Sequence, residues 1–154
     1  MFEGYIVDWQ YSGPYLADKP FEEKFAPELD PGKSIEWKQI SIDPTVPRPY
    51  VMDFNKIRLL GGDNRAVYLR TNVFSPIEQQ VDMVKRGDDG NQVWVNGEIV
   101  HSSNNVKVNL IKGWNPVMVK VAQGGGGWSA CVALRKNDAA VPGLKSQSVL
   151  EQDK

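Results

Sequence analysis

An alternation of apolar and polar residues with a period of two runs through the second half of the chain. Residues 106–110 read Val-Lys-Val-Asn-Leu, and residues 117–121 read Val-Met-Val-Lys-Val. Because successive side chains of a strand point to opposite faces, this alternation is typical of strands with one buried face. Gly113 and Pro116 lie between the two runs, so the pattern predicts consecutive strands joined by a short turn.

Six further segments have the composition of strands and are bounded by turn residues. They are residues 5–11, 66–74, 80–85, 92–95, 99–101 and 128–134. Their spacing of about 10 to 15 residues is typical of sandwiches and jelly rolls. A helix of one or two turns is expected within 20–28, and 41–65 is expected to wrap the fold as a long connection. We therefore expect an all-β protein, an antiparallel β-sandwich of jelly-roll type with about eight strands.

The length of the chain, 154 residues with 41% hydrophobic, fits one domain with a single core. We assign this β-sandwich domain to residues 1–144. The alternation is lost toward the end of the chain, so residues 145–154 are expected to form a C-terminal linker or a disordered tail.

Charge and cysteine content exclude several classes of function. Lys and Arg number 18 against 19 Asp and Glu, so the chain lacks the basic surface that nucleic acid or an anionic membrane requires. The same balance argues against highly sulfated or uronate-rich ligands, although a basic patch at Lys85 and Arg86 leaves them open. One cysteine, Cys131, and one histidine exclude a disulfide framework and four-ligand zinc clusters. The sequence has no bilayer-spanning apolar run and no export signal at its start.

The turn-rich segment 86–101 contains candidate ligand and metal residues. Its Asp-Gly and Asn-Gly pairs are strong hairpin signals, because both central residues of a type I′ turn need positive φ. The first interpretation is therefore two tight turns on either side of a short strand. The alternative is a calcium site, in which Asp88 and Asp89 supply adjacent carboxylates as hard oxygen ligands.

Five tryptophans provide ring surface on which a sugar can stack. Trp94 lies between two valines and points outward if they point into the core, so it is a candidate for an exposed platform. It could equally cover the second sheet of the sandwich or an interface with a neighbouring domain. Trp114 lies in a turn and either plugs one end of the fold or faces a ligand. Trp9 and Trp128 alternate in phase with apolar neighbours and are expected in the core, whereas the pattern around Trp37 leaves its position open.

The motifs, taken in chain order, resemble a known family. They are Asp-Trp-Gln-Tyr-Ser-Gly-Pro-Tyr at 8–15, Ala-Val-Tyr-Leu-Arg-Thr at 66–71, Ser-Pro at 75–76, Gly-Asp-Asp-Gly at 87–90, Val-Trp-Val-Asn-Gly at 93–97, Gly-Trp-Asn at 113–115 and Val-Lys-Val at 119–121. This order resembles the galactose-binding-like jelly-roll modules of bacterial polysaccharide-degrading proteins, including the sugar-binding domain of family 2 glycoside hydrolases. The Asp-Asp-Gly and Asn-Gly portion is also similar to the lectin-like domains named after anthrax protective antigen. The resemblance covers residues 5–144.

The resemblance implies a non-catalytic role. The chain would bind a polysaccharide or oligosaccharide, or it would pack beside a catalytic domain of the same parent protein without its own ligand. In the lectin-like relatives the paired aspartates hold calcium that in turn holds sugar, and Asp88 and Asp89 match them by position. Such a module would work outside the cell, in the periplasm or at the cell surface as part of a larger protein.

Catalysis by the chain itself is not expected. It contains no Gly-x-Ser-x-Gly elbow, and its cysteine falls within a predicted strand rather than in an electropositive loop. Arg70 is interpreted as a ligand contact or as a partner in an ion pair across the sheets. We therefore expect a carbohydrate-binding accessory module that stacks sugars on aromatic rings. Its expected ligand-binding residues are Trp94, Trp114, Asp88, Asp89, Asn96 and His101.

Overall fold

The computed structural model describes residues 3–30, 34–42, 44–87, 90–100 and 105–150. Within them the elements are β1 (Gln10–Leu16), α1 (Ala26–Leu29), β2 (Lys38–Gln39), β3 (Met52–Asp53), the 3-10 helix η1 (Phe54–Lys56), β4 (Arg65–Ser75), β5 (Gln79–Gly87), β6 (Asn91–Val95), β7 (Glu98–Val100), β8 (Asn105–Leu110), β9 (Gly113–Gln123), β10 (Ser129–Lys136), β11 (Ala139–Ala140) and β12 (Lys145–Gln147). The predicted all-β class is confirmed. The strand count exceeds the expected eight or so because five of the twelve described strands have only two or three residues.

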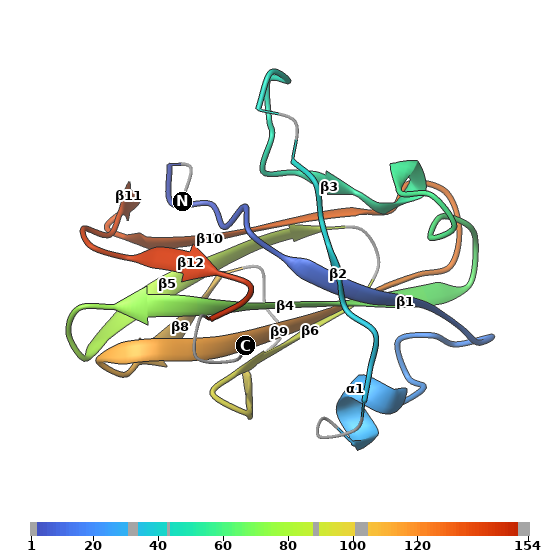
Figure 1. Ribbon diagram of the computed structural model, residues 1–154, viewed down its shortest axis with the longest axis horizontal. Helices are drawn as coiled ribbons and strands as arrows, with labels where there is room; N and C mark the ends of the chain where they lie inside the picture. Colours follow the sequence, from blue (N-terminus) through green and yellow to red (C-terminus); the bar gives the residue numbers. More distant parts are fainter. Residues whose placement is uncertain (1–2, 31–33, 43, 88–89, 101–104, 151–154) are drawn as a thin grey trace.

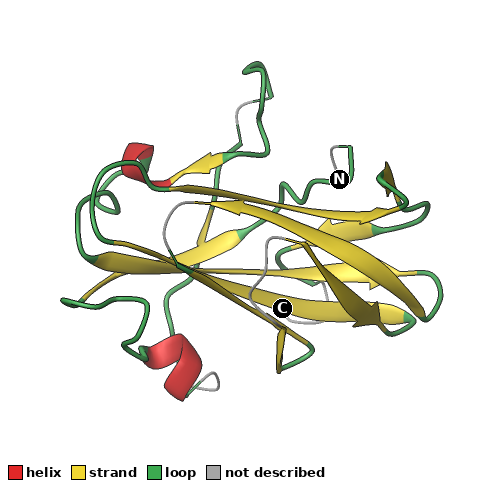
Figure 2. Ribbon diagram, turned by 180° about the vertical axis from the view of Figure 1, so that it is seen from behind, coloured by secondary structure: helices red, strands yellow, loops and turns green. Residues whose placement is uncertain are grey.

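The strands form two antiparallel sheets that pack as a sandwich (Figure 1). The larger sheet has the order β2-β1-β4-β9-β6-β7, and β12 pairs with the C-terminal part of β4. The smaller sheet has the order β11-β10-β5-β8, and β3 pairs with β10. Figures 1 and 2 show α1 and η1 on opposite sides of this sandwich. Neither described helix is long and apolar enough to cross a lipid bilayer.

The hydrophobic core lies between the sheets, as the alternation predicts. In β4 and β9 the core residues fall at alternate positions, including Val67 and Leu69 of one strand and Val119 of the other. Trp9 and Trp128 are no more than 1% exposed, which confirms their expected place in the core. The other side chains of these strands point away from the core, onto the surface that we call the outer face of the sheet.

The pairing of β4 with β9 is the longest in the fold. Eleven residues are in unbroken antiparallel register, from Arg65 opposite Gln123 to Ser75 opposite Gly113. Because no residue is inserted, side chains opposite each other fall on the same face of the sheet. This pair therefore forms a regular platform at the centre of the larger sheet.

Both ends of the chain differ from the sequence-based expectations. The strand expected at 5–11 begins only at Gln10, because Tyr5 makes a single bridge to Ala133 of the smaller sheet before the chain crosses to the larger one. The segment 145–154, expected as a linker or disordered tail, forms β12 over its first three residues. Leu150 beyond β12 is buried. The segment through Leu150 is thus packed on the sandwich, and residues 151–154 lie outside the described part.

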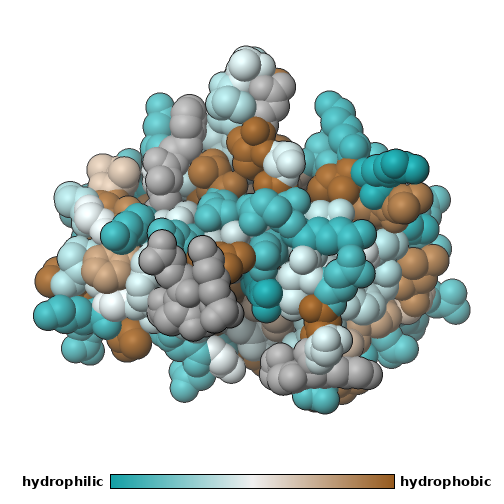
Figure 3. All heavy atoms as spheres, in the orientation of Figure 1, coloured by the Kyte–Doolittle hydropathy of each residue, from teal (hydrophilic) through white to brown (hydrophobic). Residues whose placement is uncertain are grey.

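The long connection 41–65 is held to the smaller sheet by its apolar residues. Phe54 is fully buried, its backbone N–H donates to the carbonyl of Trp128 at 2.8 Å, and the two rings pack at 5.2 Å between centroids. The connection therefore wraps the sandwich, as expected, but with fixed contacts. On the face shown in Figure 3, hydrophilic residues separate smaller hydrophobic patches.

Candidate functional site

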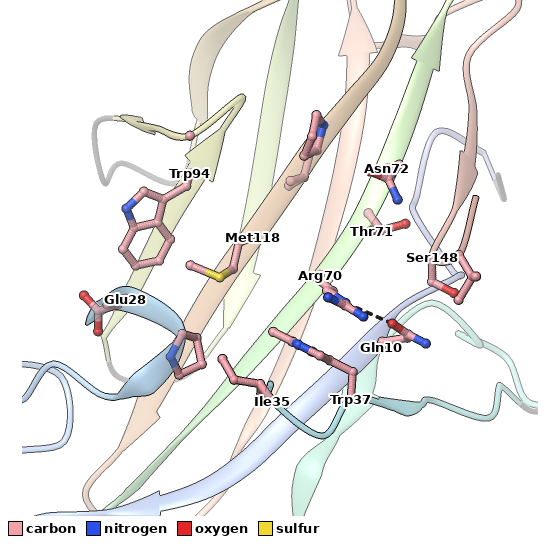
Figure 4. A pocket seen from close by; sticks show the side chains of 15 residues that line it. Gln10, Glu28, Ile35, Trp37, Arg70, Thr71, Asn72, Trp94, Met118 and Ser148 are labelled. Carbon is pink, nitrogen blue, oxygen red and sulfur yellow. Dashed lines mark hydrogen bonds between the residues drawn. The ribbon is translucent and has the colours of Figure 1, made fainter. Parts of the chain in front are cut away.

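A groove of about 750 Å³ lies on the outer face of the larger sheet (Figure 4). Its floor is a row of side chains across four neighbouring strands. The register places Gln10 of β1 opposite Arg70 of β4, Arg70 opposite Met118 of β9, and Met118 opposite Trp94 of β6. With a strand spacing of about 4.8 Å, the row spans roughly 14 Å. It is long enough to contact more than one unit of a polymer.

The sides of the groove come from three segments that lie over the sheet. They supply Pro27 and Glu28 of α1, Ile35 and Trp37 before β2, and Ser148 and Val149 after β12. We call Pro27 and Glu28 the α1 wall. Figure 4 shows Glu28 on the side of Trp94 and Ser148 on the side of Gln10. These three segments form walls around the floor, so the groove is deeper than the surface of an open sheet.

Trp37 is fixed over the floor by Arg70. The guanidinium carbon lies 4.3 Å from the centroid of the Trp37 ring, and Nε donates to Gln10 Oε1 at 2.9 Å. A cation stacked on a tryptophan face is attracted to it, so the two side chains orient each other. Since Arg70 lies on the outer face, the alternative of an ion pair between the two sheets does not hold.

Two tryptophans therefore flank the groove. Trp94 is half-buried, and its neighbours Val93 and Val95 are in the core, so the prediction that Trp94 points outward is confirmed. Trp37 is also half-buried and lies nearer Gln10, while Met118 lies between the two (Figure 4). Alternation alone could not find Trp37, because its place depends on a partner 33 positions further along the chain.

A buried ion pair holds the α1 wall against the sheet. Lys120 Nζ lies 2.7 Å from Glu28 Oε2 and donates to the backbone carbonyls of Phe21 at 3.0 Å and Glu23 at 2.5 Å. Lys120 is only 1% exposed. A lysine at an outward position of β9 is ordinarily solvated, but here the segment around α1 covers it. Sequence reasoning did not identify this pair.

Aromatic groups complete the surroundings of the Lys120 ammonium. The ring centroids of Phe25 and Tyr68 lie 5.5 and 5.6 Å from Nζ. The Tyr68 hydroxyl is hydrogen-bonded to Glu28 Oε2. Burial, followed by this hydrogen bond, raises the pKa of Tyr68 well above its usual value, so the phenol stays a neutral donor. The ionised Glu28 is thus held by Lys120 and Tyr68 together.

Trp114 lies on the same outer face as the groove but does not line it. It packs edge-to-face on Phe74, with ring centroids 5.4 Å apart, and Lys145 Nζ lies 5.9 Å from its ring. It is half-buried, so part of the ring remains accessible. Its expected role in binding stays a prediction.

Asn96 is part of the turn between β6 and β7. Its φ of 53° is in the left-handed region, as the hairpin signal predicts. Its Nδ2 donates to Oδ1 of the buried Asn115 at 2.9 Å. Asn96 thus helps to fix the turn, and it is the next residue, Gly97, that lines the groove.

The remaining predicted site residues, Asp88, Asp89 and His101, lie outside the described residues. Within the described part, no three His, Cys, Asp or Glu side chains gather where they could hold a metal ion. The calcium site at Asp88 and Asp89 therefore stays a prediction from the sequence.

Comparison with known proteins supports the β-sandwich. No protein-family model and no curated protein matches the chain. A solved anti-sigma factor domain-containing protein superposes with a TM-score of 0.55 at 12% identity, over 97% of this chain and 47% of its own. An anti-sigma factor domain-containing protein from Clostridium clariflavum superposes with a TM-score of 0.50 at 9% identity, over 94% of this chain and 42% of its own. At such identities the likeness shows the fold alone, and this chain spans less than half of either neighbour.

Proposed function

We propose that the chain is a non-catalytic carbohydrate-binding module of the galactose-binding-like kind and that its ligand lies in the groove on the larger sheet. The observation that carries the proposal is the pair of half-buried tryptophans, Trp37 and Trp94, at opposite sides of a floor that contains Gln10 and Arg70. Rings and planar polar groups on one surface suit a ligand that is apolar on its ring faces and rich in hydroxyls at its edges.

The chemistry of binding follows from these side chains. The C–H faces of a pyranose pack on the indole rings of Trp37 and Trp94. Hydroxyls at the edges of the sugar exchange hydrogen bonds with the amides of Gln10 and Asn72 and receive them from the Arg70 guanidinium. Affinity is expected to be weak, since a shallow groove buries little area and every sugar hydroxyl gives up water.

The acid groups of the groove also support a role in binding rather than catalysis. Among the described residues that line it, Glu28 is the only carboxylate, and it is already held by Lys120 and Tyr68. Hydrolysis of a glycosidic bond ordinarily uses two carboxylates, one on each side of the bond. In the proposed role the groove holds a glycan, and chemistry is left to another domain.

The proposed setting is a larger protein that acts on polysaccharide outside the cell. In both solved neighbours the matched part is less than half of the chain, so this fold occurs there together with further segments. A catalytic domain of the same parent would benefit from a module that keeps it near the polymer, because tethering raises the effective concentration of the second binding partner.

A second candidate function is an interface without a ligand, in which the outer face packs on a neighbouring domain. Ile99 of β7 lies opposite Trp94 in the sheet and is 68% exposed, so the row continues as an apolar edge. Such an edge favours contact with protein surface.

Tryptophan fluorescence and calorimetry with a panel of plant and algal polysaccharides test the proposal. Binding should alter the tryptophan fluorescence. Trp37→Ala and Trp94→Ala should each lower the affinity for the polysaccharide about tenfold or more, as is usual for central aromatic contacts. Trp114→Ala is the matched control, since this ring lies outside the groove. No response across the panel would refute carbohydrate binding, whereas binding lost only in Trp114→Ala would place the site elsewhere on the face.

A further inference from the structure

A second hollow, of about 300 Å³, lies on the other side of the sandwich, against the outer face of the smaller sheet. It is built from three parts of the chain that are far apart in sequence: the N-terminal segment, the connection before β3, and the strands β5 and β10. The residues that matter for its chemistry are Tyr5, Arg48, Tyr50, Arg86, Ser129 and Cys131. We call it the tyrosine–arginine pocket.

The described residues that line this pocket carry a net positive charge. Two of them, Arg48 and Arg86, are arginines, and none of the described lining residues is acidic. Cys131 lies opposite Arg86 in the pairing of β10 with β5. Burial raises the pKa of the Cys131 thiol, while the charges of Arg86 and Arg48 lower it. Arg48 and Arg86 therefore come from separate segments of the chain, and both guanidinium charges act on the Cys131 thiol.

The pocket is held in shape by contacts that involve no ligand. The rings of Tyr5 and Tyr50 stack with centroids 3.7 Å apart and planes at 13°, which ties the connection to the N-terminal segment. That segment is tied to β10 in turn, because the Ile6 N–H donates to the Val132 carbonyl at 2.9 Å. Arg135 does not line the pocket, but its guanidinium carbon lies 5.0 Å from the centroid of the Tyr5 ring and helps to fix that ring. A rigid, cationic site loses little entropy when it binds an anion.

The basic patch expected at Lys85 and Arg86 is thus rearranged by the fold. Lys85 points between the sheets and is 2% exposed, and its Nζ has no hydrogen-bond partner among the described residues. Arg86 points to the opposite face, where Arg48 joins it from 38 positions earlier in the chain. The cationic surface therefore combines residues that no local sequence pattern connects.

We propose that the tyrosine–arginine pocket is a second ligand site and that it binds the carboxylate of a uronic acid. A guanidinium offers a planar fork of donors that matches a carboxylate. It has five N–H donors, so Arg86, whose Nη1 donates to the Lys85 carbonyl at 2.9 Å, can hold a ligand oxygen as well. The stacked Tyr5 and Tyr50 provide ring surface beside the arginines for the sugar.

This site is independent of the groove, because the two lie on opposite outer faces of the sandwich. The proposal therefore does not rest on the proposed function, and either can fail alone. A polymer that carries both neutral and acidic sugars would have a place on each face.

Nuclear magnetic resonance of the isotope-labelled chain tests the pocket directly, with glucuronate as the probe and glucose as its neutral match. Glucuronate should shift the side-chain Nε–Hε signals of Arg48 and Arg86 and the backbone amide of Cys131 in a saturable manner, and glucose should not. Arg48→Gln and Arg86→Gln should each weaken the binding about tenfold or more, since each removes a charge-assisted contact. Arg58→Gln, which removes an exposed arginine outside the pocket, should leave it unchanged.

Three results would overturn the proposal: no saturable shift with glucuronate, equal shifts with glucose, or unchanged binding in the double variant R48Q/R86Q. Arg48→Lys keeps the positive charge but not the fork, so it should fold normally and still bind more weakly. The dispersion of the amide signals reports the fold of every variant in the same spectra. Trp94→Ala should leave glucuronate binding unchanged, which separates this site from the groove.

Discussion

The ion pair between Lys120 and Glu28 holds one wall of the groove, and Lys120→Met tests its contribution to the fold. The side chains of Lys120 and Glu28 are 2% and 13% exposed. Loss of the ammonium leaves a nearly buried carboxylate and removes the donor from the carbonyls of Phe21 and Glu23. Methionine keeps much of the length of the side chain, so a cavity contributes little.

The expected loss of stability is large. Removing one partner of a buried ion pair destabilises a fold by about 3 to 5 kcal/mol. For a chain of this size, each kcal/mol lowers Tm by roughly 2 to 4 °C, so the midpoint should fall by about 6 to 20 °C. The double variant E28Q/K120M should recover part of the loss, because it leaves no unpaired charge.

Urea unfolding monitored by circular dichroism measures the change in the free energy of unfolding. Lys107→Met is the matched control. Lys107 also lies on a strand and pairs with Asp82 at 2.9 Å, but its side chain is 67% exposed. An exposed pair contributes about 1 kcal/mol or less. If Lys120→Met destabilises no more than Lys107→Met, the α1 wall is not held by its ion pair and the reasoning is refuted.

Three further substitutions test other parts of the fold by urea unfolding. Lys85→Met should stabilise the fold by about 1 to 3 kcal/mol at pH 7, because the buried amine has no hydrogen-bond partner in the described part of the chain. Burial lowers the pKa of Lys85 in the folded chain, so protonation of this amine destabilises the fold. This destabilisation is complete at low pH and disappears as the pH rises toward the unfolded-state pKa of about 10.4. The stability gap between the two proteins should therefore narrow between pH 7 and 10, and a constant gap would contradict this assignment. Asn115→Leu should destabilise the fold by about 2 kcal/mol or more, because Nδ2 donates to three backbone carbonyls and Oδ1 accepts from the Ile111 N–H. A loss of stability below about 0.5 kcal/mol, which is typical of surface sites, would show that this hydrogen-bond network is dispensable. Leu150→Ala should lower the free energy of unfolding by about 2 kcal/mol. An unchanged free energy of unfolding would mean that Leu150 adds nothing to the core.

The alternation of residues predicted which side of each strand faces the core. It placed the strands around 66–74, 80–85 and 117–121, and the inward tryptophans Trp9 and Trp128, because burial of one face imposes the pattern directly. It failed at Lys85, which occupies an inward position of β5 although it carries a charge. Such a residue breaks the pattern, and only the packed structure shows that it stays inside.

The candidate site was predicted less completely, since alternation says which way a residue points but not what covers it. Trp94 could be assigned to the outer face from its two valine neighbours. Trp37 and the α1 wall could not, because their places depend on Arg70 and Lys120, which are distant in sequence. The strand β12 after Leu144 was missed for a different reason, because polar residues are acceptable on a short strand at the edge of a sheet and leave no alternation to detect.

The unbroken register of β4 and β9 has a consequence for how such a protein can change. Arg70 and Met118 of the groove floor alternate with residues such as Leu69 and Val119 that fill the core, so one pair of strands serves two separate purposes. A substitution at a floor position alters the chemistry of the outer face and leaves the packing between the sheets untouched. The outer face can therefore change one outward residue at a time, on a scaffold whose inward residues stay fixed.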